Sequence, residues 1–559
     1  MNYSELVETY RKLESTQATL EKTDILAELF SAAGDELEDV VLLSMGRAFP
    51  SWQDLDLGIS SKTMVDIIKE ASGRSEAEIE EAWKEEGDLG SAAEQILEGG
   101  GGQQSLMQQE LTVERVNDKL EKVAKMEEES LGSVSMDKKK KEVAALLNDS
   151  TPGEAKYVVR TFIENLRLGV GEGIVRDALA EAFFDGEHAD EIQRAYDLTN
   201  DFREVASACR DGVEELESLE IELFRPIKSM LAKKVESIED GFEEVGRPAA
   251  VDYKYDGFRA QVHCRDGEVK VFTRRLEDVT EQFPDVAEFV EEHVDAENFI
   301  IDAEVTAYDP EDGSTIPFQE LSRRVKRKYD IAEMREKIPV EVRPFDLLYL
   351  EGSMIQEPYR ERFEQLQEIV EEQEHELRLA DRIVTDEEEE VSALQQQALD
   401  DGHEGIMMKN PDAEYRPGSR VGYMVKLKPV METLDLAIIG AKWGEGRRSD
   451  WLSRLKLGCY DEQKQEHLQT GKMATGLTDE QLEEITERLK PLIVEEDGRD
   501  VKVRPKVIVE VEYEEIQESP TYSSGYALRF PRLKSFRDEK DEADSLEKVE
   551  RLYQQQEQT

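Results

Sequence analysis

Apolar residues recur at helical spacing through the first 220 residues of the chain. Two early sets, with members one, three and four residues apart, are Leu6, Val7, Tyr10, Leu13 and Ile25, Leu26, Leu29, Phe30. This spacing places the apolar side chains on one face of an α-helix. The segment Thr151-Pro152-Gly153-Glu154 has a capping residue, an early proline and an acid, as in the first turn of a helix. We therefore predict a mainly helical region over residues 1–220.

Strand-like patterns dominate from about residue 225 onward. Short runs rich in β-branched and aromatic residues occupy positions 249–253, 269–273, 299–305, 341–349 and 405–409, with a helical pattern at 360–376. They predict a mixed α/β domain with a substantial sheet over residues 221–430. In residues 431–559, strand-like runs at 434–440 and 506–513 flank one predicted helix at 478–489. Short strands in a region of this size suit a small β-barrel.

Two glycine-rich segments are predicted to be loops. Four consecutive glycines at 99–102, followed by polar residues to 105, break the helical pattern. The segment Gly169-Val170-Gly171-Glu172-Gly173 is similar to a phosphate-binding loop, but no strand precedes it and no Lys-Ser or Lys-Thr pair follows. We interpret it as a turn between two helices.

The composition is polar, but it leaves enough apolar residues for several cores. Of 559 residues, 38% are hydrophobic and 36% are charged, and the net charge is −58. The acidic excess is spread along the chain, as at residues 76–86, 217–222, 371–376 and 387–390, which favours a halophilic cytoplasm. Because molar salt shortens the Debye length to about 3 Å, the charge does not exclude a DNA substrate. We expect folding and activity to increase with salt into the molar range.

The sequence also excludes several classes of protein. No apolar stretch approaches the ~20 residues that span a bilayer, and the first residues have neither the basic nor the apolar part of a secretory signal. We therefore expect a soluble, cytoplasmic protein that binds no membrane. The three cysteines, Cys209, Cys264 and Cys459, are too far apart in sequence for a disulfide framework or a cysteine-rich zinc site.

The segment Lys254-Tyr255-Asp256-Gly257-Phe258-Arg259 follows a predicted strand and has the most informative side chains. A lysine beside an acid and an arginine is most often ordinary protein surface. The functional alternative is a nucleophilic Lys254. An amine must lose its proton before it attacks, and positive charge nearby favours that loss.

Charged residues on later predicted strands favour the interpretation of Lys254 as a nucleophile. Asp302 and Glu304 lie two residues apart on an apolar strand, so they share one face. Acids that are partly buried need cations nearby. Further charged residues flank or occupy apolar strands downstream: Glu404, Lys426 and Lys428. Phe345 offers a flat ring for a base, although a phenylalanine in the core is the commoner meaning.

With these elements in this order, the chain resembles the ATP-dependent DNA ligases, within the covalent nucleotidyltransferases. Residues 254–259 are similar to the family's adenylation motif. The other matching elements are Thr273-Arg274-Arg275, Asp302-Ala303-Glu304, Phe345-Asp346-Leu347, Glu404-Gly405, Lys426-Leu427-Lys428 and Arg529-Phe530-Pro531-Arg532 with residues 537–540. The resemblance covers nearly the whole chain, including residues 225–232, and its pattern is of the archaeal replicative type.

The resemblance implies an all-α DNA-binding domain (1–220), an α/β adenylation (nucleotidyltransferase) domain (221–430) and a C-terminal OB-fold β-barrel (431–559). It implies that Lys254 attacks the α-phosphate of ATP and becomes lysyl-AMP. AMP then moves to the 5′-phosphate of a nick, and the 3′-hydroxyl displaces it. Mg²⁺, or Mn²⁺ as an alternative, would neutralise the phosphoryl oxygens. The cellular roles implied are DNA replication, repair and recombination.

The resemblance also implies a role for each matching residue. Asp252 would accept a hydrogen bond from the adenine amino group, and Phe345 would stack on the base. Arg259, Arg274 and Glu304 would contact the ribose or phosphate, and Arg420, Lys426 and Lys428 would hold phosphate. Glu404 is the better metal candidate, with Asp302 as the second. Arg532 and Lys540 would orient the pyrophosphate leaving group.

Two positions depart from the family pattern. Asp252 stands where the family usually has Glu, so a shorter acid must reach the same donor. Met424 stands where a Trp often precedes the Lys-x-Lys strand. In addition, residues 323–328 form the densest basic run of an acidic chain, and we predict that Arg323, Arg324 and Arg327 contact DNA.

Two alternatives remain open at the level of sequence. An RNA ligase or a capping guanylyltransferase would use the same chemistry, although the long helical region disfavours a minimal capping enzyme. A non-catalytic DNA clamp is disfavoured by the intact Lys254, Glu304, Glu404 and Lys426. We expect a monomer with nicked double-stranded DNA as its partner, and the sequence leaves a sliding-clamp partner and the use of ADP or GTP open.

Overall fold

The computed structural model describes residues 1–50, 52–53, 55–99, 110–128, 133–325, 330–429, 432–444, 448, 450–540 and 542–557. The chain divides into two compact units. One comprises Met1–Gln395 with Ile406–Leu427, and the other comprises Gln396–Gly405 with Lys428–Thr559. The boundaries 220 and 430 expected for three domains stay predictions. The first unit contains both a helical region and a central sheet region.

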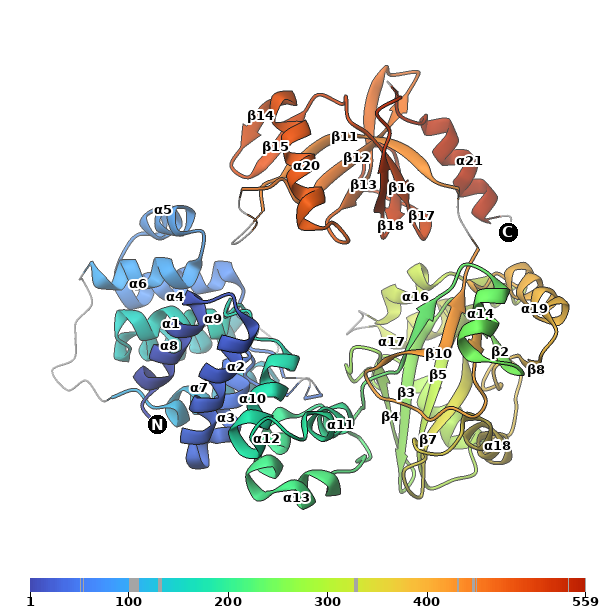
Figure 1. Ribbon diagram of the computed structural model, residues 1–559, viewed down its shortest axis with the longest axis horizontal. Coiled ribbons are helices and arrows are strands. Elements are labelled where there is room, and N and C mark those ends of the chain that lie inside the picture. Colours follow the sequence, from blue (N-terminus) through green and yellow to red (C-terminus); the bar gives the residue numbers. More distant parts are fainter. Residues whose placement is uncertain are drawn as a thin grey trace. The chain divides into compact units, whose positions relative to one another are not determined.

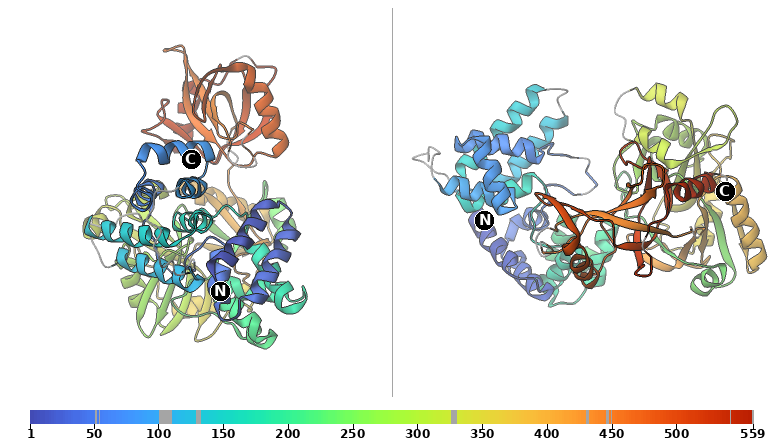
Figure 2. Two further views of the ribbon diagram at one scale, coloured as in Figure 1. Left: turned by 90° about the vertical axis from the view of Figure 1, so that its left-hand side faces the viewer. Right: turned by 90° about the horizontal axis from the view of Figure 1, so that it is seen from above.

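The helical region forms one bundle, seen in blue to cyan in Figures 1 and 2. Its elements are α1 (Tyr3–Ser15), α2 (Thr19–Ala32), the 3₁₀ helix η1 (Gly34–Glu36), α3 (Leu37–Ser44), α4 (Ser61–Ser72), α5 (Glu76–Glu86), α6 (Leu89–Glu98), α7 (Val113–Glu128), α8 (Ser133–Asp149), α9 (Pro152–Phe162), α10 (Glu172–Phe184), α11 (Ala189–Thr199), α12 (Phe202–Asp211) and α13 (Val213–Ser218). The prediction of a helical N-terminal region is confirmed. Leu6, Tyr10 and Leu13 of the predicted apolar stripe are fully buried in its core.

Local signals placed α9 correctly. The Thr151 side chain accepts a hydrogen bond from the Glu154 N–H, and the Glu154 carboxylate accepts one from the Thr151 N–H (2.8 Å). This capping box satisfies two N–H groups at the helix start. Residues 163–171 connect α9 to α10, so the turn predicted at 169–173 does lie between two helices, although its last two residues, Glu172 and Gly173, already belong to α10. Of the predicted loop 99–105, only Gly99 lies among the described residues, directly after α6.

Two sheets form the centre of the first unit (Figure 1). One sheet has the order β1 (Leu231–Lys234), β10 (Arg420–Leu427), β9 (Gly405–Lys409), β2 (Ala249–Lys254), β8 (Arg382–Thr385). The other has the order β4 (Glu268–Thr273), β3 (Phe258–Arg265), β5 (Asn298–Tyr308), β6 (Thr315–Ile316), and β7 (Val340–Leu350) pairs with β5. All five predicted strand runs are strands, so the mixed α/β prediction is confirmed.

Helices accompany both sheets, and they are α14 (Ile238–Val245), α15 (Pro284–His293), α16 (Phe318–Val325), α17 (Ile331–Lys337), α18 (Tyr359–Ile369) and α19 (Glu388–Asp400). The helix predicted at 360–376 ends earlier, at Ile369. Val370 is already extended and bridges Val294. The polar run 371–376 after it lacks the apolar face that would continue the helix.

The segment 221–230 connects α13 to β1 and is held by side chains of β3. His263 Nδ1 accepts from the Phe224 N–H (3.0 Å), and the Gln261 amide pairs with both the N–H (2.9 Å) and the carbonyl (3.0 Å) of Ile227. His263 and Gln261, which are two residues apart on β3, therefore hold the backbone of the segment at Phe224 and Ile227, much as a neighbouring strand would.

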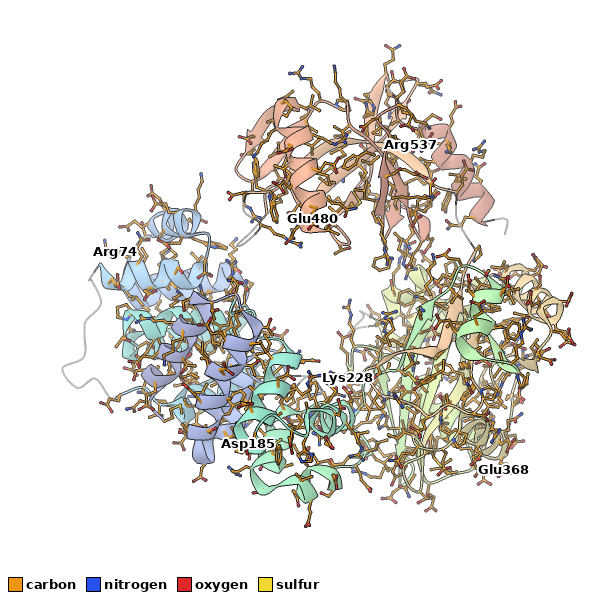
Figure 3. The ribbon with its side chains drawn as sticks, in the orientation of Figure 1. Arg74, Asp185, Lys228, Glu368, Glu480 and Arg537 are labelled. Carbon is orange, nitrogen blue, oxygen red and sulfur yellow. The ribbon has the colours of Figure 1, made fainter. Side chains whose placement is uncertain are left out.

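The other side of this segment contacts the helical region. Arg225 donates to the Thr199 carbonyl (2.5 Å), and its guanidinium lies 5.2 Å from the ring of Trp52. Lys228 forms an ion pair with Glu172 (2.7 Å), and Figure 3 shows it near the cyan helices. The segment 221–230 thus links the helical region to the sheet that contains β3, whose first two residues belong to the predicted adenylation motif.

The second unit is rich in strands. It contains β11 (Leu434–Lys442), β12 (Leu455–Asp461), β13 (Glu466–Met473), α20 (Asp479–Leu489), the 3₁₀ helix η3 (Lys490–Leu492), β14 (Ile493–Asp497), β15 (Asp500–Val503), β16 (Ile508–Glu512), β17 (Glu515–Glu518), β18 (Tyr526–Arg529), β19 (Arg532–Phe536) and α21 (Leu546–Glu557). Residues 434–437 of β11 pair with β16, and residues 440–442 of the same strand pair with β15. β11 therefore joins two parts of the sheet. A strand-rich C-terminal region is confirmed, although the pairings of the described strands do not close a barrel.

The prediction of a single helix in this region was wrong, because α21 follows α20. Its signal was present in the sequence: Leu546, Val549 and Leu552 recur every three residues, and the last two are buried in the core. The described helices include none that is long and apolar enough to cross a membrane. All three cysteines are buried and free.

Candidate nucleotide-binding site

Lys254 lies at the end of β2, and Asp252 lies two residues before it, on the same face of the strand. Asp252 is buried. Its carboxylate forms ion pairs with Lys409 of β9 and, at 3.8 Å, with Arg382 of β8, and it accepts a hydrogen bond from the Tyr359 hydroxyl (3.2 Å). The predicted base acceptor and the predicted nucleophile therefore share one surface of the first sheet.

The turn after Lys254 is shaped by close packing on β5. A Cβ at Gly257 would lie 2.3 Å from the carbonyl oxygen of Val305 and 3.0 Å from Cγ of Glu304, so only glycine fits there. Asp256 accepts a hydrogen bond from the Phe318 N–H at the start of α16 (3.1 Å). The glycine and the aspartate of the predicted motif thus shape the turn.

Arg259 and Asp302 form a buried bidentate pair. Arg259 Nε donates to Asp302 Oδ1 (2.8 Å), Nη2 pairs with Oδ2, and Nη1 donates to the Met230 carbonyl (2.7 Å). Burial acts to lower the pKa of Arg259, but Asp302 and the Tyr415 hydroxyl beside it raise that pKa overall. Asp302 is fully buried, and both of its oxygens accept hydrogen bonds from the guanidinium. This arrangement fits a residue that orients Arg259 better than it fits the second metal ligand predicted from the sequence.

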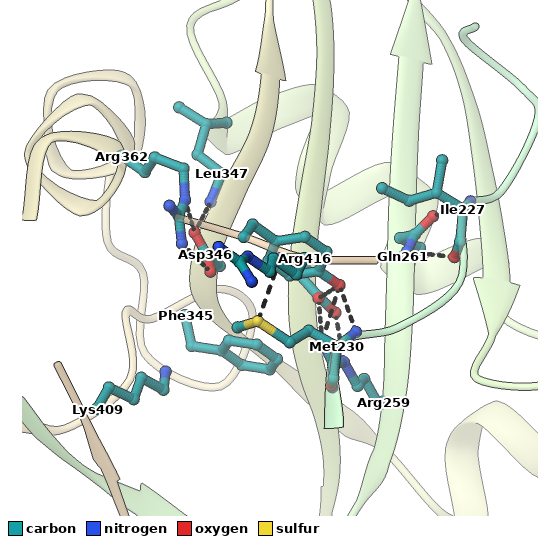
Figure 4. Close-up of polar contacts among 12 residues, drawn as sticks. Ile227, Met230, Arg259, Gln261, Phe345, Asp346, Leu347, Arg362, Lys409 and Arg416 are labelled. Carbon is teal, nitrogen blue, oxygen red and sulfur yellow. Dashed lines mark hydrogen bonds and ion pairs between the residues drawn. The ribbon is translucent and has the colours of Figure 1, made fainter. Parts of the chain in front are cut away.

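Phe345 of β7 lies between two cations. Its ring centroid is 4.8 Å from Lys409 Nζ and 5.3 Å from Arg259 Cζ, and Figure 4 shows the ring near both side chains. Its carbonyl accepts from the Tyr359 hydroxyl (3.0 Å). The next residue, Asp346, is buried against Arg362 in a second bidentate pair (2.7 and 2.9 Å). The strand that carries the predicted stacking residue is therefore fixed by charged groups in the interior.

Arg259, Glu304 and Arg420, three residues with predicted nucleotide contacts, lie close enough to Arg274 to act on its charge. Glu304 lies opposite Arg259 in the register of β5 and β3. Arg274 is exposed, and burial of part of its side chain together with Arg259 and Arg420 lowers its pKa, whereas Glu304 raises it. Arg420 is also exposed and donates to the Ala232 carbonyl (2.8 Å). Two exposed guanidiniums above a buried pair give a surface suited to phosphate.

Lys426 of β10 lies opposite Met407 of β9. Lys428, two residues further on, forms an ion pair with Glu404 (2.9 Å), and both side chains are 17% exposed. The predicted metal ligand and one predicted phosphate-binding lysine are thus neighbours. Met424, at the position that departs from the family pattern, is buried in the core that includes Met230 and Tyr415.

In the second unit, Arg532 begins β19 and is exposed. Lys540 forms an ion pair with Asp435, which also lies 3.2 Å from Arg537 Nε. Asp435 belongs to β11, so this pairing ties the segment after β19 to the sheet of the same unit.

Of the three arginines predicted to contact DNA, the two that the structure describes differ in their exposure. Arg323 is exposed and pairs with Glu320 on its own helix. Arg324 corrects the prediction, because its guanidinium is fully buried and bonded to Asp285 and to the carbonyls of Gln282 and Ile338. Arg327 lies outside the described residues. Neighbouring residues of a helix point in different directions, so the side chain of Arg324 faces the core while that of Arg323 faces solvent.

Several buried residues of the site were not predicted: Tyr359, Arg362, Arg382, Lys409 and Tyr415. Lys409 had a visible signal, since it ends the strand that Glu404 precedes. Away from this site, Glu292, His293 and Glu376 have ligand atoms close enough together to share a cation, and His293 already bonds Glu376 (2.5 Å).

Comparison with known proteins gives a consistent result for the whole chain. Family models match in order: "DNA ligase N terminus" over residues 2–180, "ATP dependent DNA ligase domain" over 229–428, and "ATP dependent DNA ligase C terminal region" over 448–540. A DNA ligase of Thermococcus fumicolans is 43% identical over 100% of this chain and 99% of its own length, and one of Archaeoglobus fulgidus is 42% identical over 100% and 99%. A solved structure named Pmar-Lig_PreS3 is similar in fold, with a TM-score of 0.60 and 17% identity, covering 95% of this chain and 99% of that one.

Proposed function

The chain belongs to the family of ATP-dependent DNA ligases, and on that premise we propose that it seals nicks in duplex DNA through a lysyl-AMP formed on Lys254. The observation that carries the assignment of the residue is its position. Lys254 ends β2 on the face that also carries Asp252, and Phe345 lies near the same group of side chains through Lys409. A base held between Asp252 and Phe345 would place its phosphates toward the strand end.

Three displacements make up the reaction. The neutral amine of Lys254 attacks the α-phosphorus of ATP, a P–N bond forms, and the bond to pyrophosphate breaks. The 5′-phosphate at the nick then takes AMP from Lys254. Finally the 3′-hydroxyl attacks that phosphate, a phosphodiester forms, and AMP leaves. Arg259, Arg274 and Arg420 support the phosphates with positive charge, since Arg259 and Arg420 lie close enough to Arg274 to lower its pKa.

Arg532 and Lys540 orient the pyrophosphate during the first displacement. This proposal rests on the family resemblance of residues 529–540 and on the exposed position of Arg532. Both residues lie on β19 or directly after it, within the second unit.

For the divalent metal, the donor at Glu404 fits best. Carboxylate oxygens are the ligands that Mg²⁺ and Mn²⁺ prefer, and Glu404 lies beside Lys428, where negative and positive groups would both face phosphate. The metal would supply charge neutralisation at the phosphoryl oxygens. The monomeric state, a sliding-clamp partner and a cytoplasmic location stay predictions.

The test is self-labelling with α-labelled ATP, followed by sealing of a nicked duplex. Lys254→Ala should abolish both, and Lys254→Arg should not restore them, because a guanidinium stays protonated and cannot attack. Lys337→Ala, on an exposed lysine of α17 paired with Glu333, is the matched control and should behave as wild type.

Normal labelling of Lys254→Ala would contradict the assignment. A nicked duplex with RNA in place of DNA separates the ligase from the RNA ligase alternative, which the names of the relatives do not favour. Stronger sealing of the RNA substrate would reverse that choice.

A further inference from the structure

Lys409 is a charged residue that the reaction above does not use, yet it lies in the interior of the site. Its side chain is 8% exposed, and that of its partner Asp252 is 2% exposed. An ammonium and a carboxylate lose most of their hydration in such a place, which is unfavourable unless both are paired and hydrogen-bonded. A buried pair at a binding site is therefore more informative than one on the surface.

The contacts of Lys409 reach both groups proposed to bind the base. Its ammonium pairs with Asp252 Oδ2, donates to the Tyr359 hydroxyl (2.9 Å) and lies 4.8 Å from the centroid of the Phe345 ring. The Tyr359 hydroxyl in turn lies 3.0 Å from the Phe345 carbonyl and 3.2 Å from Asp252 Oδ2. Lys409 and Tyr359 thus connect the base acceptor to the stacking residue.

One oxygen of Asp252 is left over by this arrangement. Oδ2 receives Lys409 and Tyr359, whereas Oδ1 is buried and has no hydrogen-bond partner among the described residues. Arg382 Nε lies 3.8 Å from Oδ1, which is too long for a hydrogen bond. A buried acceptor without a donor is unfavourable, so Oδ1 is suited to a ligand that donates.

The charge of Lys409 is secure at neutral pH. Burial lowers its pKa, but Asp252 and Tyr359 raise it, and the net effect is an increase above the ordinary value.

We propose that Lys409 is the positioning residue that makes this site select a purine with a 6-amino group. By holding Oδ2, it directs Oδ1 of Asp252 toward position 6 of a base stacked on Phe345. Adenine presents a donor there, whereas guanine and hypoxanthine present a carbonyl oxygen, which would place two acceptors against each other. A site built to bond a substrate donor rejects analogues that lack it. The inference rests on the proposed function, because it concerns the same nucleotide.

The experiment compares self-labelling by ATP with that by purine riboside 5′-triphosphate, which lacks only the amino group. In the wild type, removing this group should lower kcat/KM about ten- to hundredfold, as expected for the loss of one hydrogen bond to a charged group. In Lys409→Met, labelling by ATP should fall by a similar factor through KM, and the two nucleotides should differ by no more than about threefold. Lys409→Arg should restore part of the preference, and Lys337→Met is the matched control.

A binding measurement separates orientation from chemistry. α,β-Methylene-ATP cannot transfer its AMP, and its dissociation constant, measured by calorimetry, should increase about tenfold in Lys409→Met. Tyr359→Phe removes one hydroxyl and leaves the ring, so it should reduce the preference for ATP by less than Lys409→Met does. This variant keeps the inference testable if Lys409→Met does not fold.

An unchanged ratio of ATP to purine riboside triphosphate in folded Lys409→Met and in Tyr359→Phe would overturn the inference while the ligase assignment stands. Unchanged binding of α,β-methylene-ATP would do the same. Failure of the wild type to label with any nucleotide would instead overturn the proposed function, and the specificity inference with it.

Discussion

Two ion pairs of the central region lie inside the protein, whereas the charged groups at the C-terminal motif lie on its surface. Arg259 and Asp302 are 17% and 0% exposed, and Arg362 and Asp346 are 1% and 5% exposed. Lys540 is 39% exposed beside Asp435, and Arg532 is exposed as well. The central region therefore holds its chemistry through its own core, and the C-terminal motif does not.

This difference predicts which substitutions change the stability of the protein and which change mainly the rate of a reaction step. Removing one partner of a buried ion pair leaves a charge in the interior and costs about 3–5 kcal/mol. An exposed pair contributes only about 0–1 kcal/mol, because water and salt screen it. Substitutions in the central region should affect folding and function together, and those in the C-terminal motif should affect mainly the reaction step they serve.

The largest effect is expected for the Arg362–Asp346 pair. Arg362→Met should lower the free energy of unfolding by about 3–5 kcal/mol, because Asp346 would remain buried without its partner. Urea unfolding at fixed salt measures this change. The double variant Arg362→Met/Asp346→Leu should recover at least half of the loss, and a single-variant loss below about 1 kcal/mol would remove the contrast between the regions.

A pH experiment tests the same contrast through the acid sensitivity that a buried histidine gives to the central region. Burial lowers the pKa of His263 to about 3, while an unfolded chain has the ordinary value of 6.5. Below pH 6.5 the unfolded chain gains a proton that the folded protein does not accept, so stability falls between pH 6.5 and 3. The slope is about 1.4 kcal/mol per pH unit, or about 2 kcal/mol at pH 5.

The measurement is urea unfolding at pH 7 and pH 5 for the wild type and His263→Gln. The variant should show the smaller loss on acidification. His467 of the second unit is only partly buried, and burial lowers its pKa too, so His467→Gln should change the acid loss less. Equal effects of the two substitutions would contradict the comparison.

In the C-terminal motif we expect an effect on one step. Arg532→Ala or Lys540→Ala should slow self-adenylation about tenfold, equivalent to about 1.4 kcal/mol of activation free energy. Closure of a pre-adenylated nick should stay close to wild type, and stability should change by at most about 1 kcal/mol. Labelling kinetics and sealing of pre-adenylated DNA measure the two steps, and equal losses in both would point to a shared phosphate role.

The smallest effect is expected at Arg323, which is exposed next to the buried Arg324. Arg323→Ala should leave stability within about 0.5 kcal/mol and reduce the salt dependence of DNA binding by about one unit of slope, if it contacts a phosphate. Binding of a nicked duplex at several salt concentrations gives the slope. An unchanged slope would show that Arg323 is ordinary surface.

Secondary structure followed the local pattern in most of the chain. The capping box at Thr151 and the apolar stripe of α1 depend on neighbours in sequence, so they could be predicted. The early end of α18 at Ile369 also has a local cause that the prediction overlooked. The missed helix α21 had an apolar repeat, but a charged and glutamine-rich segment hid it.

The site residues divide in a similar way. Lys254, Asp252 and Phe345 lie in motifs whose order along the chain could be read. In the structure Lys254 shares β2 with Asp252, and Asp252 and Phe345 both lie against Lys409. Tyr359 and Arg382 carry no motif, because their roles come from packing between α18, β8 and β2. Arg324 looked like a member of a basic surface, and only its burial against Asp285 showed otherwise.

The sequence by itself determined the family, the order of the regions and the identity of the motif residues, because these depend on residue type and spacing. Tertiary structure alone decided which charges are buried and which oxygen of Asp252 remains without a partner. Those properties arise where strands distant in sequence, such as β2, β8 and β9, lie side by side. Desolvation there turns ordinary acids and bases into fixed pairs, and the strength of that effect depends on neighbours that no local pattern specifies.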